Sequence, residues 1–302
     1  MDIEVPDRLV TAILFARGQA DGEAWLRALP RRVDHYLRRW DLKPIEIANG
    51  GAMSCCLFCV TTGGEEAVLK IPFDAASGRL ESRSLDRWAK AQASPRVLAT
   101  APSSGVFLMS RVRPGTTAVP TGQPSDSVHF SELITRMAWP GLGSMRGLQT
   151  LETVVRMRFE WAYERFLDPG YERELELMAG VERLLTALLD TSGPPSIIHG
   201  DLQFKNVLVG EGGDWQAIDP FTCRGDVNAE AALWIAVQGD GSTVEQRIAE
   251  LAQCPLLAEG RLRAWTYVHC VAEYRSYMPE VAARTRDFAE KLDWQELVAA
   301  LV

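Results

Sequence analysis

The most informative segment of the chain is residues 197–209, which have the sequence IIHGDLQFKNVLV. A polar cluster, residues 199–206, lies between two apolar runs. The apolar runs anchor the segment in a core, whereas the polar side chains must lie at an edge or a cleft because burying a charge is costly. The segment therefore predicts a firmly held loop that presents polar groups to a ligand.

Three oxygen-bearing side chains mark this part of the chain. Asn206 follows Asp201 by five positions, and Asp219 follows Asn206 by thirteen, at the end of a second short apolar run. Carboxylate and amide oxygens are the ligands that Mg²⁺ prefers. This order is typical of kinases, in which the first carboxylate contacts the acceptor hydroxyl and the other two side chains hold magnesium. We therefore predict that Asp201 is catalytic and that Asn206 and Asp219 bind the metal.

The N-terminal part of the chain contains a lysine that suits the same kinase reaction. Lys70 ends a strand-like run, and Glu81 lies on the helical stretch that follows, residues 78–92. A lysine in this place reaches nucleotide phosphates, and a helical glutamate can form an ion pair with it. The alternatives are a solvated lysine at a strand end, or an ion pair with Glu66, Asp74 or Asp86 in place of Glu81.

The hydrophobic pattern changes twice along the chain. Residues 7–40 have helical periodicity, residues 44–112 form short strand-like runs with glycine turns, and the chain is mostly helical beyond residue 129. Residues 116–128 are rich in Thr, Pro, Ser and Gly and are expected to form a loop. We predict an α+β fold with an N-terminal nucleotide-binding lobe, residues 1–112, and a helical catalytic and acceptor-binding lobe, residues 113–302.

Composition excludes several classes of protein. The 302 residues are 47% hydrophobic and 24% charged, which is ordinary for a globular protein, and the net charge is −8. An acidic chain lacks the basic footprint that nucleic-acid phosphates require. The longest uncharged stretch, residues 48–64, contains glycine pairs at both ends and does not suit a membrane span. The N-terminus lacks the features of a signal peptide, so we expect a cytoplasmic protein.

Cysteines cluster at positions 55, 56 and 59. A metal-binding or redox pair at Cys56 and Cys59 is one interpretation, but zinc would need a second pair of ligands at suitable spacing. We expect a buried strand instead, in which free cysteines behave as small apolar residues.

Together these segments resemble the aminoglycoside phosphotransferase superfamily. Residues 199–206 and 218–220 are similar to its Brenner motif and metal motif. Further matches follow the order of its streptomycin 6-phosphotransferase and hydroxyurea phosphotransferase branch: Trp40-Asp41-Leu42, Val68-Leu69-Lys70, Arg113-Pro114-Gly115-Thr116 and Gly225-Asp226. Departures occur at Gln203, where the branch often has a second histidine, and at residues 221–224.

The resemblance implies a bilobal, protein-kinase-like fold that uses ATP and Mg²⁺ to phosphorylate a hydroxyl group of a small molecule. An aminoglycoside such as streptomycin is the expected acceptor, which implies antibiotic resistance, and the net charge of −8 suits a cationic acceptor. A different antibiotic, hydroxyurea or a metabolite alcohol stays open as the acceptor. A non-catalytic nucleotide-binding protein is a further alternative. We expect a monomer or a weak dimer, with no nucleic-acid or membrane partner.

The resemblance also implies a set of nucleotide contacts. Met109, Ser110 and Val112 would form the hinge that contacts adenine, and Ile218 would pack against the base. Backbone amides near Gly51 would bind phosphate.

Acceptor contacts are expected at the start of the helix predicted from residue 227. Asp226 is a cap of that helix, a group near the metal, or an acceptor ligand. Glu230 and Trp234 lie four positions apart and share a helix face. These two side chains either line the acceptor pocket, pack in the core or lie on the surface.

Overall fold

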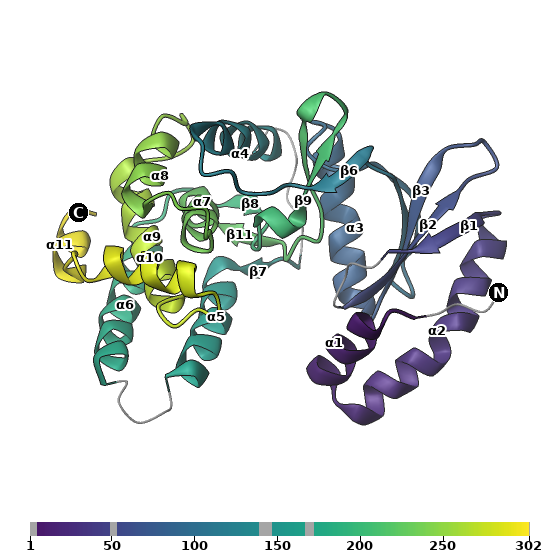
Figure 1. Cartoon of the computed structure of the whole chain (residues 1–302), viewed down its shortest axis with the longest axis horizontal. Coiled ribbons are helices and arrows are strands. Elements are labelled where there is room, and N and C mark those ends of the chain that lie inside the picture. Colours follow the sequence, from purple (N-terminus) through teal and green to yellow (C-terminus); the bar gives the residue numbers. More distant parts are fainter. Residues whose placement is uncertain (1–4, 49–52, 139–146, 167–171, 302) are drawn as a thin grey trace. The chain divides into compact units, whose positions relative to one another are not determined.

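The computed structural model describes residues 5–48, 53–138, 147–166 and 172–301. The chain divides into two compact units, Met1–Gly115 and Thr116–Val302. Their helices and strands are labelled in Figure 1. Strand β6 (Pro114–Thr117) contains the boundary between the two units.

The N-terminal unit is a five-stranded sheet with three helices. Its elements are α1 (Asp7–Arg17), α2 (Gln19–Arg39), β1 (Lys43–Ile47), β2 (Ser54–Val60), β3 (Glu66–Pro72), α3 (Ala75–Ala89), β4 (Val97–Ala101) and β5 (Val106–Ser110). The strand order is β1-β2-β3-β5-β4, and every neighbouring pair is antiparallel. The expected antiparallel sheet is confirmed.

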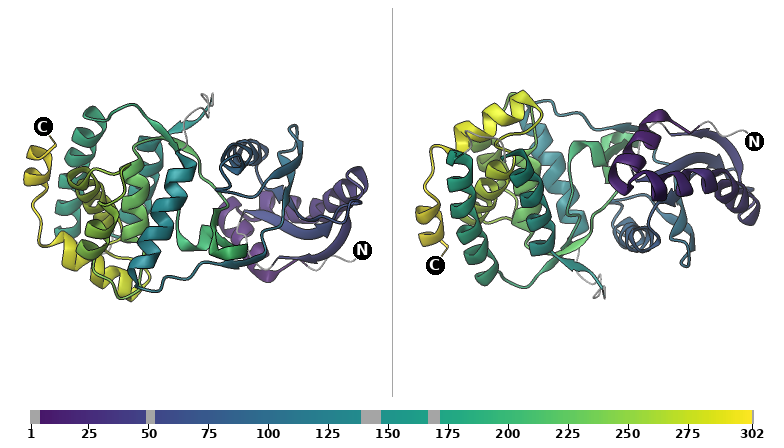
Figure 2. Two further views of the ribbon diagram at one scale, coloured as in Figure 1. Left: turned by 90° about the horizontal axis from the view of Figure 1, so that it is seen from above. Right: turned by 90° about the horizontal axis from the view of Figure 1, so that it is seen from below.

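Alternation along the strands gives this sheet two apolar faces. Cys55, Leu57 and Cys59 pack with α1 and α2, whereas Phe58 on the other face packs with Leu85 of α3. Figure 2 shows α3 on the side of the sheet away from α1 and α2. The sheet is therefore covered by helices on both faces.

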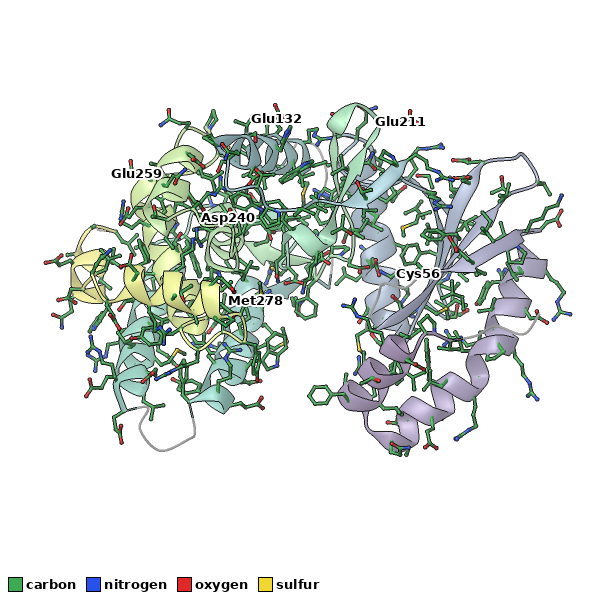
Figure 3. The ribbon with its side chains drawn as sticks, in the orientation of Figure 1. Cys56, Glu132, Glu211, Asp240, Glu259 and Met278 are labelled. Carbon is green, nitrogen blue, oxygen red and sulfur yellow. The ribbon has the colours of Figure 1, made fainter. Side chains whose placement is uncertain are left out.

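The cysteines lie in strand β2, as expected. Cys56, labelled in Figure 3, belongs to the α3 side of the sheet, and Cys59 belongs to the opposite side. Residues three apart in a strand point to opposite faces, so these two thiols cannot chelate one metal ion. Burial raises the pKa of Cys55 to about 12, which keeps its thiol protonated and unreactive.

Helix α3 is placed by a cap and a close approach. The Asp74 carboxylate accepts a hydrogen bond of 2.7 Å from the backbone N–H of Ser77 and so caps the helix. A side chain at Gly78 would bring its Cβ within 2.3 Å of the Gly105 carbonyl oxygen, so only glycine allows the helix to lie this close to the β4–β5 turn. One turn further along, this packing places Glu81 beside strand β3.

The C-terminal unit is mostly helical. Its helices are α4 (Pro124–Met137), α5 (Leu151–Arg165), α6 (Glu172–Asp190), α7 (Val227–Ala236), α8 (Val244–Leu251), α9 (Glu259–Ala272), α10 (Pro279–Ala289) and α11 (Trp294–Ala299). The strands are β7 (Gln149–Thr150), β8 (Ser196–Ile198), β9 (Val207–Gly210), β10 (Trp215–Ala217) and β11 (Cys223–Gly225). They form two small sheets, ordered β10-β9-β6 and β7-β11-β8. Within the described residues, no helix is long and apolar enough to cross a membrane.

Two features of this unit bear on its active groups. Helix α7 is buried on all sides and packs against α9. Helix α4 starts at Pro124 and strand β6 ends at Thr117, so the loop that we expected over residues 116–128 is wrong for residues 116–117 and 124–128. A proline in the first helical turn needs no backbone hydrogen-bond donor, so the polar composition there marks a helix start as well as a loop.

Candidate active site

Residues 199–206 form a loop between β8 and β9, and glycine is required at its second position. Gly200 has a φ of +78°, and a Cβ there would lie 2.4 Å from the Phe221 carbonyl oxygen. The ring nitrogen Nε2 of His199 lies 2.9 Å from the Ile218 carbonyl oxygen. These two contacts join the loop of Asp201 to the segment that carries Asp219, so the two groups are held together.

Glu230 of α7 holds the same loop by its backbone. Its carboxylate accepts hydrogen bonds from the N–H groups of Gly200, at 2.9 Å, and Leu202, at 3.1 Å. Burial raises the pKa of Glu230, and the backbone donors and His199 offset only part of this effect. Glu230 therefore binds the loop of residues 199–206. The sequence had left open whether it lines an acceptor pocket, packs in the core or lies on the surface.

The Asp201 carboxylate has donors on both oxygens. Its Oδ1 atom accepts from Arg158 at 2.7 Å and from Gln203 at 2.5 Å. Its Oδ2 atom accepts from Asn206 at 2.9 Å and lies 3.4 Å from the ammonium of Lys205. Burial by itself raises the pKa of Asp201. The positive charges of Arg158 and Lys205 lower the pKa by more than burial raises it, so the net pKa lies below the ordinary value. The group is an ionised carboxylate in a fixed orientation.

Asn206 and Asp219 suit a magnesium ion. The Asn206 amide nitrogen also donates to the Asp201 carbonyl oxygen at 2.8 Å, which turns the amide oxygen away from Asp201. The Ile218 N–H donates to the Asn206 carbonyl oxygen at 2.9 Å and so brings the next residue, Asp219, close to Asn206. Asp219 has a φ of +56°, a left-handed conformation that is uncommon for residues other than glycine.

These donors fit a metal that nucleotide phosphates help to bind. No group of three or more His, Cys, Asp or Glu side chains in the described ranges is placed to hold a metal ion. Magnesium in kinases needs no such group, since one carboxylate, one amide and phosphate oxygens coordinate it.

The N-terminal unit contains the expected ion pair. Lys70 Nζ lies 2.6 Å from Glu81 Oε1, and the two side chains are only 4% and 11% exposed. The structure therefore contradicts a solvated lysine at this position. Glu66 instead pairs with Arg113 and, more weakly, with Arg111, and Asp74 caps α3.

The expected hinge lies at the end of β5. Met109 is buried in the sheet, and the N–H of Ser110 donates to the Arg96 carbonyl oxygen at 2.8 Å. The N–H of Val112 has no backbone acceptor among the described residues. Ile218 is half-buried in the C-terminal unit. Gly51 lies outside the described residues.

The two other residues considered for the acceptor have structural contacts. Asp226 caps α7 by accepting from the N–H of Asn228 at 2.9 Å, and it also accepts from Trp265 at 2.8 Å. Trp234 has no exposed surface and stacks on Phe130 with a centroid distance of 4.5 Å. Capping is thus the interpretation of Asp226 that its contacts support, and Trp234 is a core residue.

Sequence reasoning missed Arg158, which contacts Asp201 directly. The two residues are 43 positions apart, on α5 and on the catalytic loop. An arginine on an amphipathic helix is usually solvated, and no local pattern distinguishes this one.

Comparison with known proteins relates the chain to a group of kinases. A family described as "Aminoglycoside/hydroxyurea antibiotic resistance kinase" matches residues 39–275. Streptomycin 6-kinase of Streptomyces glaucescens is 28% identical over 88% of both chains. Hydroxyurea phosphotransferase of Kitasatospora aureofaciens is 30% identical over 87% of this chain and 77% of its own. A choline/ethanolamine kinase family protein from Mesorhizobium loti has the same fold, with a TM-score of 0.64, 18% identity, and coverage of 89% of this chain and 98% of that chain.

Proposed function

The chain belongs to the aminoglycoside/hydroxyurea antibiotic resistance kinase family, and we propose that it transfers the γ-phosphoryl group of ATP to a hydroxyl group of a cationic aminoglycoside in the cytoplasm. As a member of this family the protein is a phosphotransferase with an alcohol group as acceptor. The observation that carries the proposal is the Asp201 carboxylate, which is ionised, oriented by Arg158 and hydrogen-bonded to Asn206, one of the two residues that would hold magnesium.

The proposed reaction is an in-line displacement. The acceptor oxygen forms a bond to the γ-phosphorus while the bond to the β–γ bridging oxygen breaks, and ADP leaves. The hydroxyl proton passes to the Asp201 carboxylate. Since both of its oxygens already accept hydrogen bonds, the incoming hydroxyl replaces one donor. Lys205 is the donor that moves most easily, because its side chain is 64% exposed and lies 3.4 Å away.

The remaining site residues act on the nucleotide. Lys70, held by Glu81, would neutralise charge on the α- and β-phosphates. A magnesium ion held by Asn206 and Asp219 would stabilise charge on the β- and γ-phosphates. The N–H of Val112 and the carbonyl group of Ser110 would bind the adenine edge, with Met109 behind the base and Ile218 against it. Amides near Gly51 would bind phosphate.

Glu273, the residue that caps the end of α9, supports a cationic acceptor. Burial raises its pKa, and this effect is partly offset first by Arg165, which pairs with Glu273 at 4.0 Å, and then by Arg158 and Lys205, the two cations that hold Asp201. Glu273 is therefore within electrostatic reach of the catalytic loop. A carboxylate at the C-terminal end of a helix is unfavourable, and a half-buried carboxylate in that place suits the binding of a positively charged substrate.

Hydroxyurea is the second candidate acceptor, because the hydroxyurea phosphotransferase is as similar to the chain as the streptomycin kinase is. Acceptor-dependent release of ADP, measured with streptomycin, hydroxyurea and a neutral polyol, separates the candidates. We expect turnover with streptomycin, and no turnover would reject the aminoglycoside proposal. Glu273→Gln should raise KM for streptomycin about tenfold with little change in kcat, because it removes one charge-assisted contact. KM for uncharged hydroxyurea should not change.

A protein that only binds nucleotide would release no ADP with any acceptor. It would still bind ATP in a calorimetric titration.

A further inference from the structure

Arg158 connects the catalytic carboxylate to the interior of the C-terminal unit. Its Nη2 atom donates to Asp201 Oδ1 at 2.7 Å and to the Gly200 carbonyl oxygen at 3.3 Å. One edge of the guanidinium group thus holds both the side chain and the backbone of the catalytic loop. The side chain is nine-tenths buried, and its Nε–H finds no hydrogen-bond acceptor in the described parts of the chain.

His269 of α9 has a buried ring nitrogen without a hydrogen-bond partner among the described residues. The side chain is 3% exposed, and this nitrogen is Nε2. Burial lowers the pKa of His269 to about 3, so the ring is neutral, and its hydrogen bond to the Ala229 backbone uses the other ring nitrogen as donor. Nε2 therefore carries a buried lone pair that accepts no hydrogen bond from the described protein atoms.

Both side chains line one small cavity. Its volume is about 10 Å³, and Gly200, Glu230 and several aliphatic residues complete the lining. A space of roughly 10–15 Å³ admits one water molecule, provided that polar groups bind it. Arg158 and His269, which both line this space, each have one buried polar atom without a partner among the described residues, a donor and an acceptor respectively, and a buried polar group without a partner is costly.

We propose that one ordered water molecule occupies this cavity, accepts a hydrogen bond from Arg158 Nε and donates one to His269 Nε2. The chain of contacts then runs from Asp201 through Arg158 and the water to His269. Arg158 is a positioning residue for Asp201, and His269 fixes Arg158 through the water. The inference rests on the proposed function, because the orientation of Asp201 affects turnover only if this carboxylate receives the hydroxyl proton.

The expected consequence for catalysis follows from geometry. Arg158 holds Oδ1, so the direction in which Oδ2 faces the acceptor depends on the guanidinium group. A displacement of about 1 Å in a catalytic group lowers turnover on the order of 100-fold. Binding of ATP does not involve these contacts and should not change.

The water itself is tested by crystallography. A high-resolution structure of the wild-type protein should show a density peak about 2.7–3.2 Å from both Arg158 Nε and His269 Nε2. In His269→Leu the peak should disappear. A wild-type cavity without density, in a map that shows other buried waters, would overturn the assignment.

The positioning role is tested by kinetics. Arg158→Ala should lower kcat by about 10- to 100-fold at unchanged KM for ATP, and added guanidinium ions at low concentration should restore part of the loss. His269→Leu should lower kcat less, and His269→Gln, which keeps an acceptor atom, should lower it least.

Arg156→Ala is the matched control, because Arg156 lies on the same helix, is 45% exposed and pairs with Glu152. It should leave kcat unchanged. If kcat of Arg158→Ala falls only in proportion to the folded fraction, and guanidinium gives no recovery, Arg158 has a structural role alone and the inference is wrong. A wild-type protein without turnover on any acceptor overturns the proposed function and the positioning role with it, whereas the crystal structure still decides on the water.

Discussion

Replacing Arg247 by methionine should strongly destabilise the C-terminal unit. The side chain of Arg247, on α8, is completely buried and contacts three carboxylates: Asp126 at 3.0 Å, Asp240 at 2.7 Å and Glu250 at 2.8 Å. Asp240, labelled in Figure 3, is as fully buried as the arginine. Methionine replaces the aliphatic part of the arginine side chain but has no guanidinium group, so the variant leaves the carboxylates in place without their cation.

The expected loss in the free energy of unfolding is about 3–5 kcal/mol, the usual cost of removing one partner from a buried ion pair. For a unit of this size, each kcal/mol lowers Tm by about 2–4 °C, so Tm should fall by about 6–20 °C. Contacts of Arg247 with the hydroxyl groups of Ser127 and Ser242 are lost as well, which favours the upper part of the range.

The loss should also depend on pH. Burial raises the pKa of Asp240 and of Glu250, but hydrogen bonds from neighbouring residues, Arg247 among them, bring both net pKa values below the ordinary value. The stability that these groups contribute is present above the ordinary carboxyl pKa, near 4, and is lost as pH falls through the lower folded values. Without the cation, burial raises the carboxyl pKa values, so mild acid protonates these groups in the variant first. The difference between the two proteins should therefore shrink from about pH 7 to about pH 4.5.

Urea unfolding at both pH values measures this difference. Far-ultraviolet circular dichroism is a suitable signal, because the C-terminal unit is mostly helical. The control is Arg263→Met, which removes a partly exposed arginine that pairs with Glu245, and it should cost less than about 1 kcal/mol. A loss below about 1 kcal/mol for Arg247→Met, or a loss that grows in acid, would refute the reasoning.

Three further variants test the catalytic groups. Asp201→Ala should lower kcat by about 100-fold or more while ATP still binds in calorimetry, and wild-type turnover would exclude Asp201 as the catalytic residue. Asp219→Asn should shift the activity curve in a magnesium titration to higher concentration, and a curve that coincides with that of the wild type would reject its role as a ligand. Gly200→Ala should cost about 1–2 kcal/mol for the left-handed conformation and displace the loop, because its Cβ would lie 2.4 Å from the Phe221 carbonyl oxygen. An alanine variant with unchanged stability and kcat would show that the loop tolerates a side chain there.

Sequence reasoning was most reliable for contacts between residues that lie close to each other in the sequence. The Lys70–Glu81 pair spans eleven positions, from a strand to the next helix, so residue types and spacing were enough to predict it. The Cys55–Cys59 run was recognised as a buried strand because its apolar residues are consecutive. The start of α4 was missed because the polar residues that begin a helix are also those that form loops.

Helix α7 shows why other assignments stayed open. Periodicity identifies a buried face only when another face is polar, and α7 is buried on all sides. The sequence could not distinguish a core residue, Trp234, from a residue that binds the catalytic loop, Glu230. Only the packing of α7 against the loop and against α9 separates them.

The sequence by itself determined the predicted chemistry: a carboxylate, an amide and a second carboxylate in a fixed order between apolar runs, and a lysine and a glutamate that pair within the N-terminal unit. This is possible because few residue types can bind magnesium or receive a hydroxyl proton, and short segments keep their spacing. Only the tertiary structure showed which residues hold these side chains in place. Arg158 and Glu230 reach the loop of Asp201 from two different helices, and contacts between segments this far apart in the chain depend on how the helices pack.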